Sequence, residues 1–284
     1  MTVCSQPKRK GAGLLRRLAS PFLPSTEYPS KYLDLTGKTA LVTGTTSGLG
    51  LEACRQLLSH GVSQLIMSAR TEIKGETVAE ELRFQYPHAD IQVWILEMES
   101  YDSVIAFTER AAVDLDRLDM VILNAGTFDP DASVSNYTGH EKMFQVNYLS
   151  TALLARLFVP VLKVVPPERE PSRLTVVTDG HYNPSRSVGA TYALVGRTLE
   201  KGAATYVDAV AVKGRESHGE TISNCRSQYR IMDCCKPVEW QDFEESFWEM
   251  TEREFRSLFT GSQTLGAKIY NAIMTEQWLR RSQA

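Results

Sequence analysis

A glycine-rich stretch at residues 43–50 is the part of the chain whose residue types and spacing most clearly specify a chemistry. It reads Thr-Gly-Thr-Thr-Ser-Gly-Leu-Gly and directly follows the apolar run 39–42. An apolar strand that leads through a glycine turn into a helix forms an anion site. Glycine lets the backbone approach a pyrophosphate, and the helix N-terminus offers free N–H groups. The context on both sides predicts dinucleotide binding. The residues expected to contact the ligand are Gly44, Ser47, Gly48, Leu49 and Gly50.

The spacing Thr-Gly-x3-Gly-x-Gly differs from the common Gly-x-Gly-x-x-Gly fingerprint and resembles that of the short-chain dehydrogenase/reductase family. The resemblance covers residues 35–178 well and 187–225 in part, and the later part resembles fungal secondary-metabolism members. It implies a Rossmann-type fold, NAD(H) or NADP(H) as cofactor, and an oxidoreductase that acts on an apolar carbonyl or alcohol.

Two basic residues follow the second apolar run. Arg70 lies 26 residues after Gly44, and Lys74 lies four residues further on. In an NAD site, an acid in this region accepts hydrogen bonds from the ribose 2′-OH, whereas an arginine pairs bidentately with a 2′-phosphate. The two residues therefore favour NADP(H). The alternative is a surface arginine that opens a helix, and Glu72 makes the local charge mixed.

The family resemblance assigns further cofactor contacts. Asn124-Ala125-Gly126 closes the fourth apolar run and resembles the family's Asn-Ala-Gly signature, where small residues let the chain pass close to the cofactor ribose. Glu97 ends the third apolar run, where the family typically has an Asp that faces the adenine. The resemblance implies cofactor contacts for Glu97, Asn124 and Gly126, and an ordinary strand-end acid is the alternative for Glu97.

Asn147 lies inside the apolar segment 139–162, which is expected to form a long helix. Asn is a poor residue for a helix interior unless its side chain has a hydrogen-bonding role. The family keeps an Asn here, and a water at the helix kink links it to the catalytic Lys in a proton relay. The resemblance implies that catalytic role for Asn147, with a purely structural hydrogen bond as the alternative.

The residues that should perform the reaction are missing from the sequence. In the family a Ser orients the carbonyl, a Tyr transfers the proton and a Lys four residues later lowers the Tyr pKa, which is about 10 in a free side chain. No Tyr-x-x-x-Lys follows residue 178. Tyr182 with Arg186 is the nearest imitation, but Pro184 disfavours a helix there and Arg does not replace Lys. Thr178 and Asp179 stand where the family has two serines, and only Thr178 offers a hydroxyl.

Two functional hypotheses therefore stay open. The first is an NADP(H)-dependent short-chain oxidoreductase. The second is a catalytically impaired or inactive NADP-binding relative, either a truncated family member or a scaffold. The glycine stretch supports both hypotheses, and the missing Tyr-Lys pair separates them.

The elements that must position these residues follow from the hydrophobic pattern. Short apolar runs occupy 39–42, 64–68, 91–96, 120–123 and 174–177, and helix-forming segments occupy 51–60, 72–86, 103–115 and 139–162. This alternation predicts parallel βαβ units with right-handed crossovers, and hence an α/β doubly wound parallel sheet covered on both faces.

The later part of the chain is expected to lack one strand and one helix relative to the family. Segments 174–177, 188–212 and 221–224 form a candidate βαβ unit in which the late helix takes the place of the missing one. Trp240, Phe243, Phe247 and Met250 fall at helical spacing, and a final helix is expected around 265–273. These helices either pack onto the sheet or a second copy, or they form an apolar wall of the substrate pocket.

Length and composition bound the remaining possibilities. The 284 residues suffice for one dinucleotide-binding domain over 35–284, with aromatic C-terminal helices from about 238. Residues 1–34 form a basic tail that we expect to be flexible, with membrane-surface contact as the alternative. A net charge of −3 gives no bias toward nucleic acid, and no apolar run suggests a transmembrane segment.

The five cysteines are odd in number and scattered, without metal-ligand spacing. This pattern favours free thiols in a reducing compartment, so the expected location is cytoplasmic and no metal site is expected. The expected partner is a small apolar carbonyl or alcohol, and a homo-oligomer is compatible with the sequence.

Overall fold

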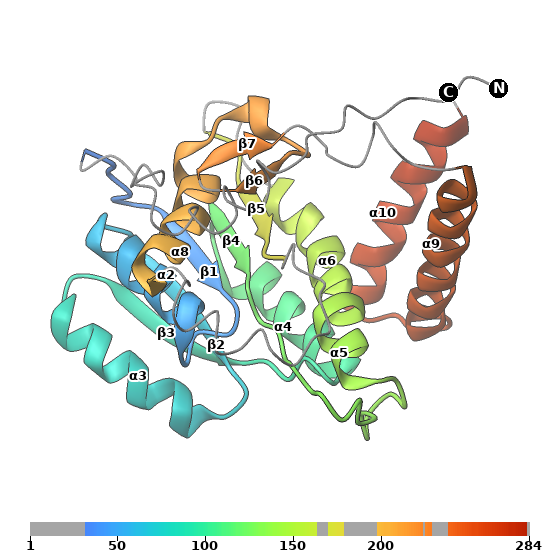
Figure 1. The fold of residues 1–284 in the computed structure, drawn as a ribbon, viewed down its shortest axis with the longest axis horizontal. Coiled ribbons are helices and arrows are strands. Elements are labelled where there is room, and N and C mark those ends of the chain that lie inside the picture. Colours follow the sequence, from blue (N-terminus) through green and yellow to red (C-terminus); the bar gives the residue numbers. More distant parts are fainter. Residues whose placement is uncertain (1–31, 164–169, 179–197, 224, 229–237, 283–284) are drawn as a thin grey trace, which may run out of the picture.

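The computed structural model describes residues 32–163, 170–178, 198–223, 225–228 and 238–282 (Figure 1). Residues 1–31, most of the expected basic tail, lie outside this range, as do Asp179, Tyr182, Pro184 and Arg186.

A five-stranded parallel sheet in the order β3-β2-β1-β4-β5 forms the centre of the molecule. Its strands are β1 (Thr39–Val42), β2 (Gln64–Ala69), β3 (Asp90–Ile95), β4 (Met120–Leu123) and β5 (Arg173–Val176). The order reverses between β1 and β4, and ligands of doubly wound folds bind at the carboxyl ends of the strands beside such a switch point. The predicted fold class is confirmed, and each predicted strand lies within one residue of its observed bounds.

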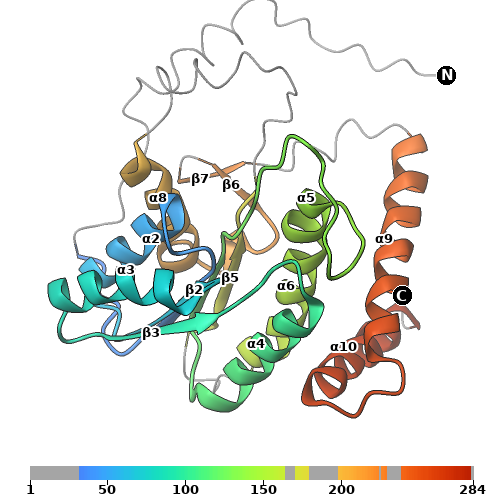
Figure 2. The ribbon, with the colours of Figure 1, turned by 90° about the horizontal axis from the view of Figure 1, so that it is seen from below.

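Helices cover both faces of the sheet (Figures 1 and 2). Helices α2 (Gly48–Ser59), α3 (Glu72–Gln85) and α8 (Leu199–Val207) belong with one hydrophobic cluster, and α4 (Tyr101–Asp114) and α6 (Thr151–Lys163) belong with the other. Helix α2 begins three residues before the predicted start, inside the glycine stretch, and Gly61 adopts φ +86° just beyond its end, as expected of a C′ glycine.

The segment predicted as one helix over 139–162 is divided into three parts. Helix α5 (Lys142–Phe144) begins later than expected, the π-helix η1 (Gln145–Ser150) follows, and α6 completes the segment. A π segment introduces an extra residue per turn and bends a helix, often at a functional site. By length and composition Lys142–Leu162 alone among the described helices is apolar enough to cross a membrane, but 56% of it is buried inside the protein, as in a core helix.

The expected βαβ unit at the end of the sheet is not formed by the described residues. Strand β6 (Thr221–Ser223) pairs antiparallel with β7 (Arg226–Gln228) in a separate two-stranded sheet, instead of extending the central one. Helix α8, the π-helix η2 (Asp208–Val212) and the short helix η3 (Arg215–Ser217) precede this hairpin. The position of β6 was predicted to within one residue, but its partner strand was not. Three residues carry too little apolar pattern to specify how a strand pairs.

Two C-terminal helices form a further layer outside α4 and α6 (Figure 1). They are α9 (Val238–Phe259) and α10 (Leu265–Ser282). Phe255, Phe259 and Tyr270 join the hydrophobic cluster that contains α4 and α6. We expected packing onto the sheet, whereas these helices pack on the helices that cover it.

Candidate dinucleotide site

The glycine turn between β1 and α2 has a backbone that only glycine fits at two positions. Gly44 has φ +70°, and a Cβ there would lie 2.9 Å from the Cα of Ala125. A Cβ on Gly50 would overlap the Gly44 carbonyl oxygen and lie 2.5 Å from Asn124 Nδ2. The turn is therefore folded tightly against the end of β4, which explains the spacing of its glycines.

Hydrogen bonds from the neighbouring strands hold this turn in place. The Thr43 hydroxyl oxygen accepts from the backbone N–H groups of Asn124 and Ala125, both at 2.9 Å. Asn124 Nδ2 donates in return to the carbonyl oxygen of Thr43 at 2.9 Å. From the other side, the Gly44 N–H donates to Ser68 Oγ at 3.1 Å. Asn124 thus contacts the backbone of the turn, and its contact with the cofactor stays a prediction.

Thr43 and Ser68 have positioning roles that the sequence reasoning missed. Thr43 is the first residue of the glycine stretch, and its spacing alone does not reveal its hydrogen bonds to β4. Ser68 is a polar residue near the end of an apolar strand, and it is 2% exposed. A buried hydroxyl needs a hydrogen-bond partner, so its polarity was the available signal.

The N-terminus of α2 is open toward an anion. Its N-cap residue Ser47 has an extended backbone (φ −167°), and its side chain makes no capping hydrogen bond. The first turn also contains no acidic residue. The first N–H groups of a helix need an external acceptor, and a phosphate is well suited to them. The residues present therefore fit the pyrophosphate of a dinucleotide.

Arg70 and Lys74 lie at the same edge of the sheet as the glycine turn. Val42 of β1 is paired in register with Met67 of β2, so the residues that follow the two strands are neighbours. Both basic side chains are exposed, and neither forms an ion pair with another described residue. Glu72 is the first residue of α3. The two cations are thus available to a phosphate.

Glu97 lies two residues beyond β3, which ends earlier than predicted. It is half-buried, and its Oε1 accepts a hydrogen bond from the Glu99 N–H at 3.0 Å. Its carboxylate therefore shapes the local turn. A contact with adenine stays a prediction.

Asn147 is brought to the carboxyl edge of β4 by the π-helix. Its Oδ1 accepts from the Thr127 N–H at 2.8 Å, and its Nδ2 donates to the Thr127 carbonyl oxygen at 2.9 Å. A Cβ on Gly126 would lie 3.3 Å from Asn147 Oδ1. Gly126 and Asn147 are therefore in contact beside the end of β4, while the catalytic role of Asn147 stays a prediction.

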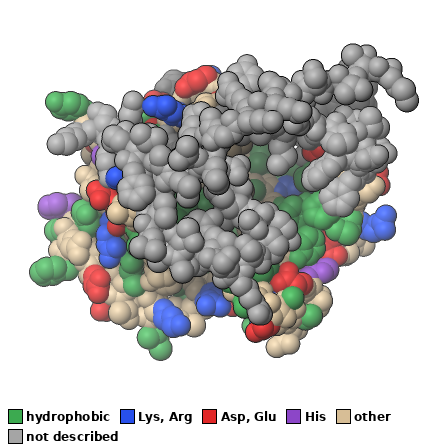
Figure 3. Space-filling model, viewed as in Figure 1, with side chains coloured by type: hydrophobic (Ala, Val, Ile, Leu, Met, Phe, Trp, Pro, Cys, Tyr) green, Lys and Arg blue, Asp and Glu red, His purple; other side chains and the backbone are tan. Residues whose placement is uncertain are grey.

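The described residues, which are the atoms of Figure 3 that are not grey, leave the reaction chemistry largely unassigned. Thr178 is exposed just beyond β5, and Tyr182 and Arg186 lie outside the described residues. Arg156 of α6 is 7% exposed and pairs with Glu252 of α9.

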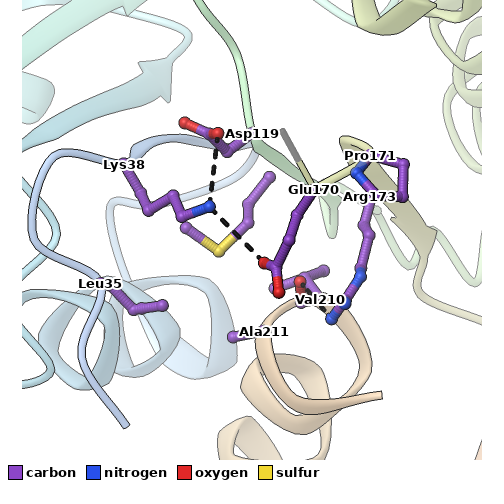
Figure 4. A pocket seen from close by; sticks show the side chains of 9 residues that line it. Leu35, Lys38, Asp119, Glu170, Pro171, Arg173, Val210 and Ala211 are labelled. Atoms are coloured by element: carbon purple, nitrogen blue, oxygen red, sulfur yellow. Dashed lines mark hydrogen bonds and ion pairs between the residues drawn. The ribbon is translucent and has the colours of Figure 1, made fainter. Parts of the chain in front are cut away.

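A small cavity at the opposite edge of the sheet does not resemble a ligand site (Figure 4). Its volume is about 30 Å³, room for one or two water molecules. Lys38 Nζ lies 3.9 Å from Asp119 Oδ1 and 3.6 Å from Glu170 Oε2. With Arg173, the cavity is lined by two basic and two acidic side chains, whose charges balance.

Comparison with known proteins identifies relatives of the chain. Residues 38–178 match the family profile described as short chain dehydrogenase. The chain is similar to the short chain dehydrogenase/reductase mfmJ of Annulohypoxylon moriforme, with 33% identity over 307 aligned positions, 82% of this chain and 89% of the relative. It is 53% identical over 131 residues to the short chain dehydrogenase virL of Hypocrea virens, with 46% of this chain and 38% of the relative covered. The chain thus spans well under two thirds of virL.

The alignment with mfmJ indicates residues that this chain lacks. Because 82% of 284 residues is about 233, about 74 of the 307 aligned positions have no residue of this chain.

Two solved structures are similar to part of the chain. One is the Pseudomonas aeruginosa RhlG/NADP complex, with 24% identity, a TM-score of 0.46, and 58% of this chain and 65% of that chain covered. The other is the oxidoreductase yciK from E. coli, with 28% identity, a TM-score of 0.41, and coverage of 48% and 57%.

Proposed function

Because the chain belongs to the short-chain dehydrogenase/reductase family, whose members are oxidoreductases that use nicotinamide cofactors, we propose that it binds NADP(H) at the glycine turn and acts on an apolar carbonyl or alcohol. The observation that carries this proposal is the uncapped N-terminus of α2 beside Arg70 and Lys74, which have no acidic partner among the described residues.

Each part of this site would hold a different part of the cofactor. The first-turn N–H groups of α2, at Gly48, Leu49 and Gly50, would bind the pyrophosphate. Arg70 and Lys74 would bind the 2′-phosphate, since a guanidinium matches two phosphate oxygens at once.

The residues after β4 would line the nicotinamide half of the site. Asn147 fixes the backbone of Thr127 through both ends of its amide, and Gly126 leaves room beside the chain for the ribose. NADP(H), when bound, donates or accepts the hydride. Asn147 would take part in the proton relay that the family resemblance implies.

A second function is favoured by one specific observation, the absence of Tyr-x-x-x-Lys after residue 178. Together with the missing alignment positions, it supports an NADP(H)-binding relative that does not turn substrate over. This alternative keeps the same cofactor site and differs only in chemistry.

The two functions are separated by a turnover assay on protein whose NADPH binding has first been measured by titration. Purified full-length chain would be mixed with NADPH and a panel of apolar ketones and aldehydes, and the loss of NADPH absorbance would be followed. Turnover supports the oxidoreductase, and saturable NADPH binding without turnover supports the binding protein. Absence of NADPH binding contradicts both.

We further place this activity in the cytoplasm and in fungal secondary metabolism. The buried free thiol of Cys54 supports a reducing compartment, and both relatives named above come from fungi.

A further inference from the structure

A cluster of three aromatic rings lies beside Asn147 and combines two distant parts of the chain. Phe144 and Tyr148 flank Asn147 on the kinked helix, and their rings stack with centroids 5.4 Å apart. Phe247 of α9 adds a third ring, 4.8 Å from Tyr148 and 6.1 Å from Phe144. We call Phe144, Tyr148 and Phe247 the aromatic wall.

The aromatic wall differs from the rings that anchor α9 in the core. Phe255 and Phe259, further along α9, are 0% and 5% exposed, whereas all three rings of the wall are only half-buried. Phe128, which directly follows the Thr127 held by Asn147, is 80% exposed. Phe144 and Tyr148 also pack against the core, but part of the aromatic surface stays exposed in the segment that carries Asn147, next to the expected nicotinamide half of the site.

Polar contacts fix the position of α9 behind this wall. The Tyr148 hydroxyl lies 3.0 Å from Thr251 Oγ1, one turn after Phe247. One turn further, Glu254 Oε1 accepts from the Tyr101 hydroxyl at 3.2 Å and lies 2.9 Å from His140 Nε2. These bonds join α9 to α4 and to the start of α5, so the rings are held in place before any ligand binds.

We infer that the aromatic wall receives the substrate and selects planar, ring-bearing carbonyl compounds over flexible aliphatic ones. This inference rests on the proposed function, because it places the substrate beside the cofactor site. Aromatic rings attract other rings in stacked or edge-to-face arrangements beyond what buried area provides. A flexible aliphatic ketone of equal size gains no such contact and loses more conformational freedom on binding.

The inference is tested by titrating 1-tetralone and 2-decanone, which have the same number of carbon atoms, into full-length protein saturated with NADP⁺. NADP⁺ cannot reduce a ketone, so binding is measured without turnover. We expect 1-tetralone to bind several-fold more tightly, and Phe247→Ala to weaken its binding about tenfold while 2-decanone changes less. Arg253→Ala, an exposed position on the same helix, should leave both affinities unchanged.

NADP⁺ affinity, measured first on every variant, reports whether the cofactor site and fold are intact. Phe247→Leu keeps an apolar side chain if the Ala variant does not fold, and it should still lose the preference for 1-tetralone. Equal binding of the two ketones, or an unchanged preference in the Phe247 variants, overturns the inference while leaving the cofactor site in place. Failure of the wild type to bind NADP⁺ overturns the proposed function and this inference together.

Discussion

Arg70 is the residue that should determine the preference for NADPH over NADH. Its exposed guanidinium has no acidic partner among the described residues, so it is available to a 2′-phosphate. We predict that Arg70→Ala weakens NADPH binding by about 1.5–3 kcal/mol, the range for a hydrogen bond to a charged group, and leaves NADH binding nearly unchanged. Fluorescence titration with both cofactors measures this. Arg253→Ala, on exposed α9 surface, is the control; equal loss for both cofactors would contradict the assignment.

Gly50 and Gly48 provide a matched pair for the glycine turn. A Cβ on Gly50 would collide with the Gly44 carbonyl, whereas a Cβ on Gly48 meets nothing within 4 Å but sits at φ +63°. We predict that Gly48→Ala costs about 1–2 kcal/mol of unfolding free energy from backbone strain alone, and that Gly50→Ala costs more and abolishes NADPH binding. Denaturant unfolding and NADPH titration of both variants measure this, and equal effects would show that the close approach is unimportant.

The glycine turn could be predicted from the sequence, because the spacing of its glycines reflects a local backbone conformation. Thr43 could not be assigned its role in the same way, since its hydroxyl bonds to Asn124 and Ala125 about eighty positions away. Hydrogen bonds between distant strands become visible only when the sheet order is known.

At the scale of elements, the π-helix η1 depends on Asn147. The Asn147 amide makes two hydrogen bonds to the backbone of Thr127, which a leucine cannot replace. We predict that Asn147→Leu lowers the free energy of unfolding by about 1–3 kcal/mol and also weakens NADPH binding, because the segment after β4 loses its support. Denaturant unfolding and NADPH titration measure these effects. Unchanged stability would show that the kink forms without Asn147.

A buried ion pair helps to attach the C-terminal layer to α6. Arg156 of α6 is 7% exposed and pairs with Glu252 of α9, while its guanidinium also lies 5.7 Å from the Tyr270 ring of α10. We predict that Glu252→Gln destabilises the protein by about 3 kcal/mol, because a buried cation loses its partner. The double variant Arg156→Met with Glu252→Leu should recover most of this loss in chemical denaturation. A double variant as unstable as Glu252→Gln would contradict this explanation.

Elements differ in how far the sequence predicts them. The predicted bounds of β1 and β4 agree with the observed ones, because a continuous apolar run bounded by polar residues specifies a buried parallel strand. The helix over 139–162 was predicted as continuous, since a π segment has no hydrophobic period of its own and the contacts that accompany it, such as that of Asn147 with Thr127, are tertiary. The position of β6 was predicted, but its partner was not.

At the scale of the whole molecule, the described residues form five parallel strands, and we propose their carboxyl edge as the cofactor half of the site. The alternation of strands and helices made this half predictable from sequence. The reaction half was not predictable, because the residues that would carry it are absent from the sequence or, like Tyr182 and Arg186, lie outside the described part.

The central claim is that this chain binds NADP(H) through the glycine turn and the two cations beside it. Fluorescence titration of the wild-type protein with NADPH and with NADH tests it most directly. We predict saturable binding of both with a clear preference for NADPH, since only NADPH carries the 2′-phosphate. Equal affinity for the two cofactors would contradict the role of Arg70 and Lys74, and no saturable binding of either would contradict the claim as a whole.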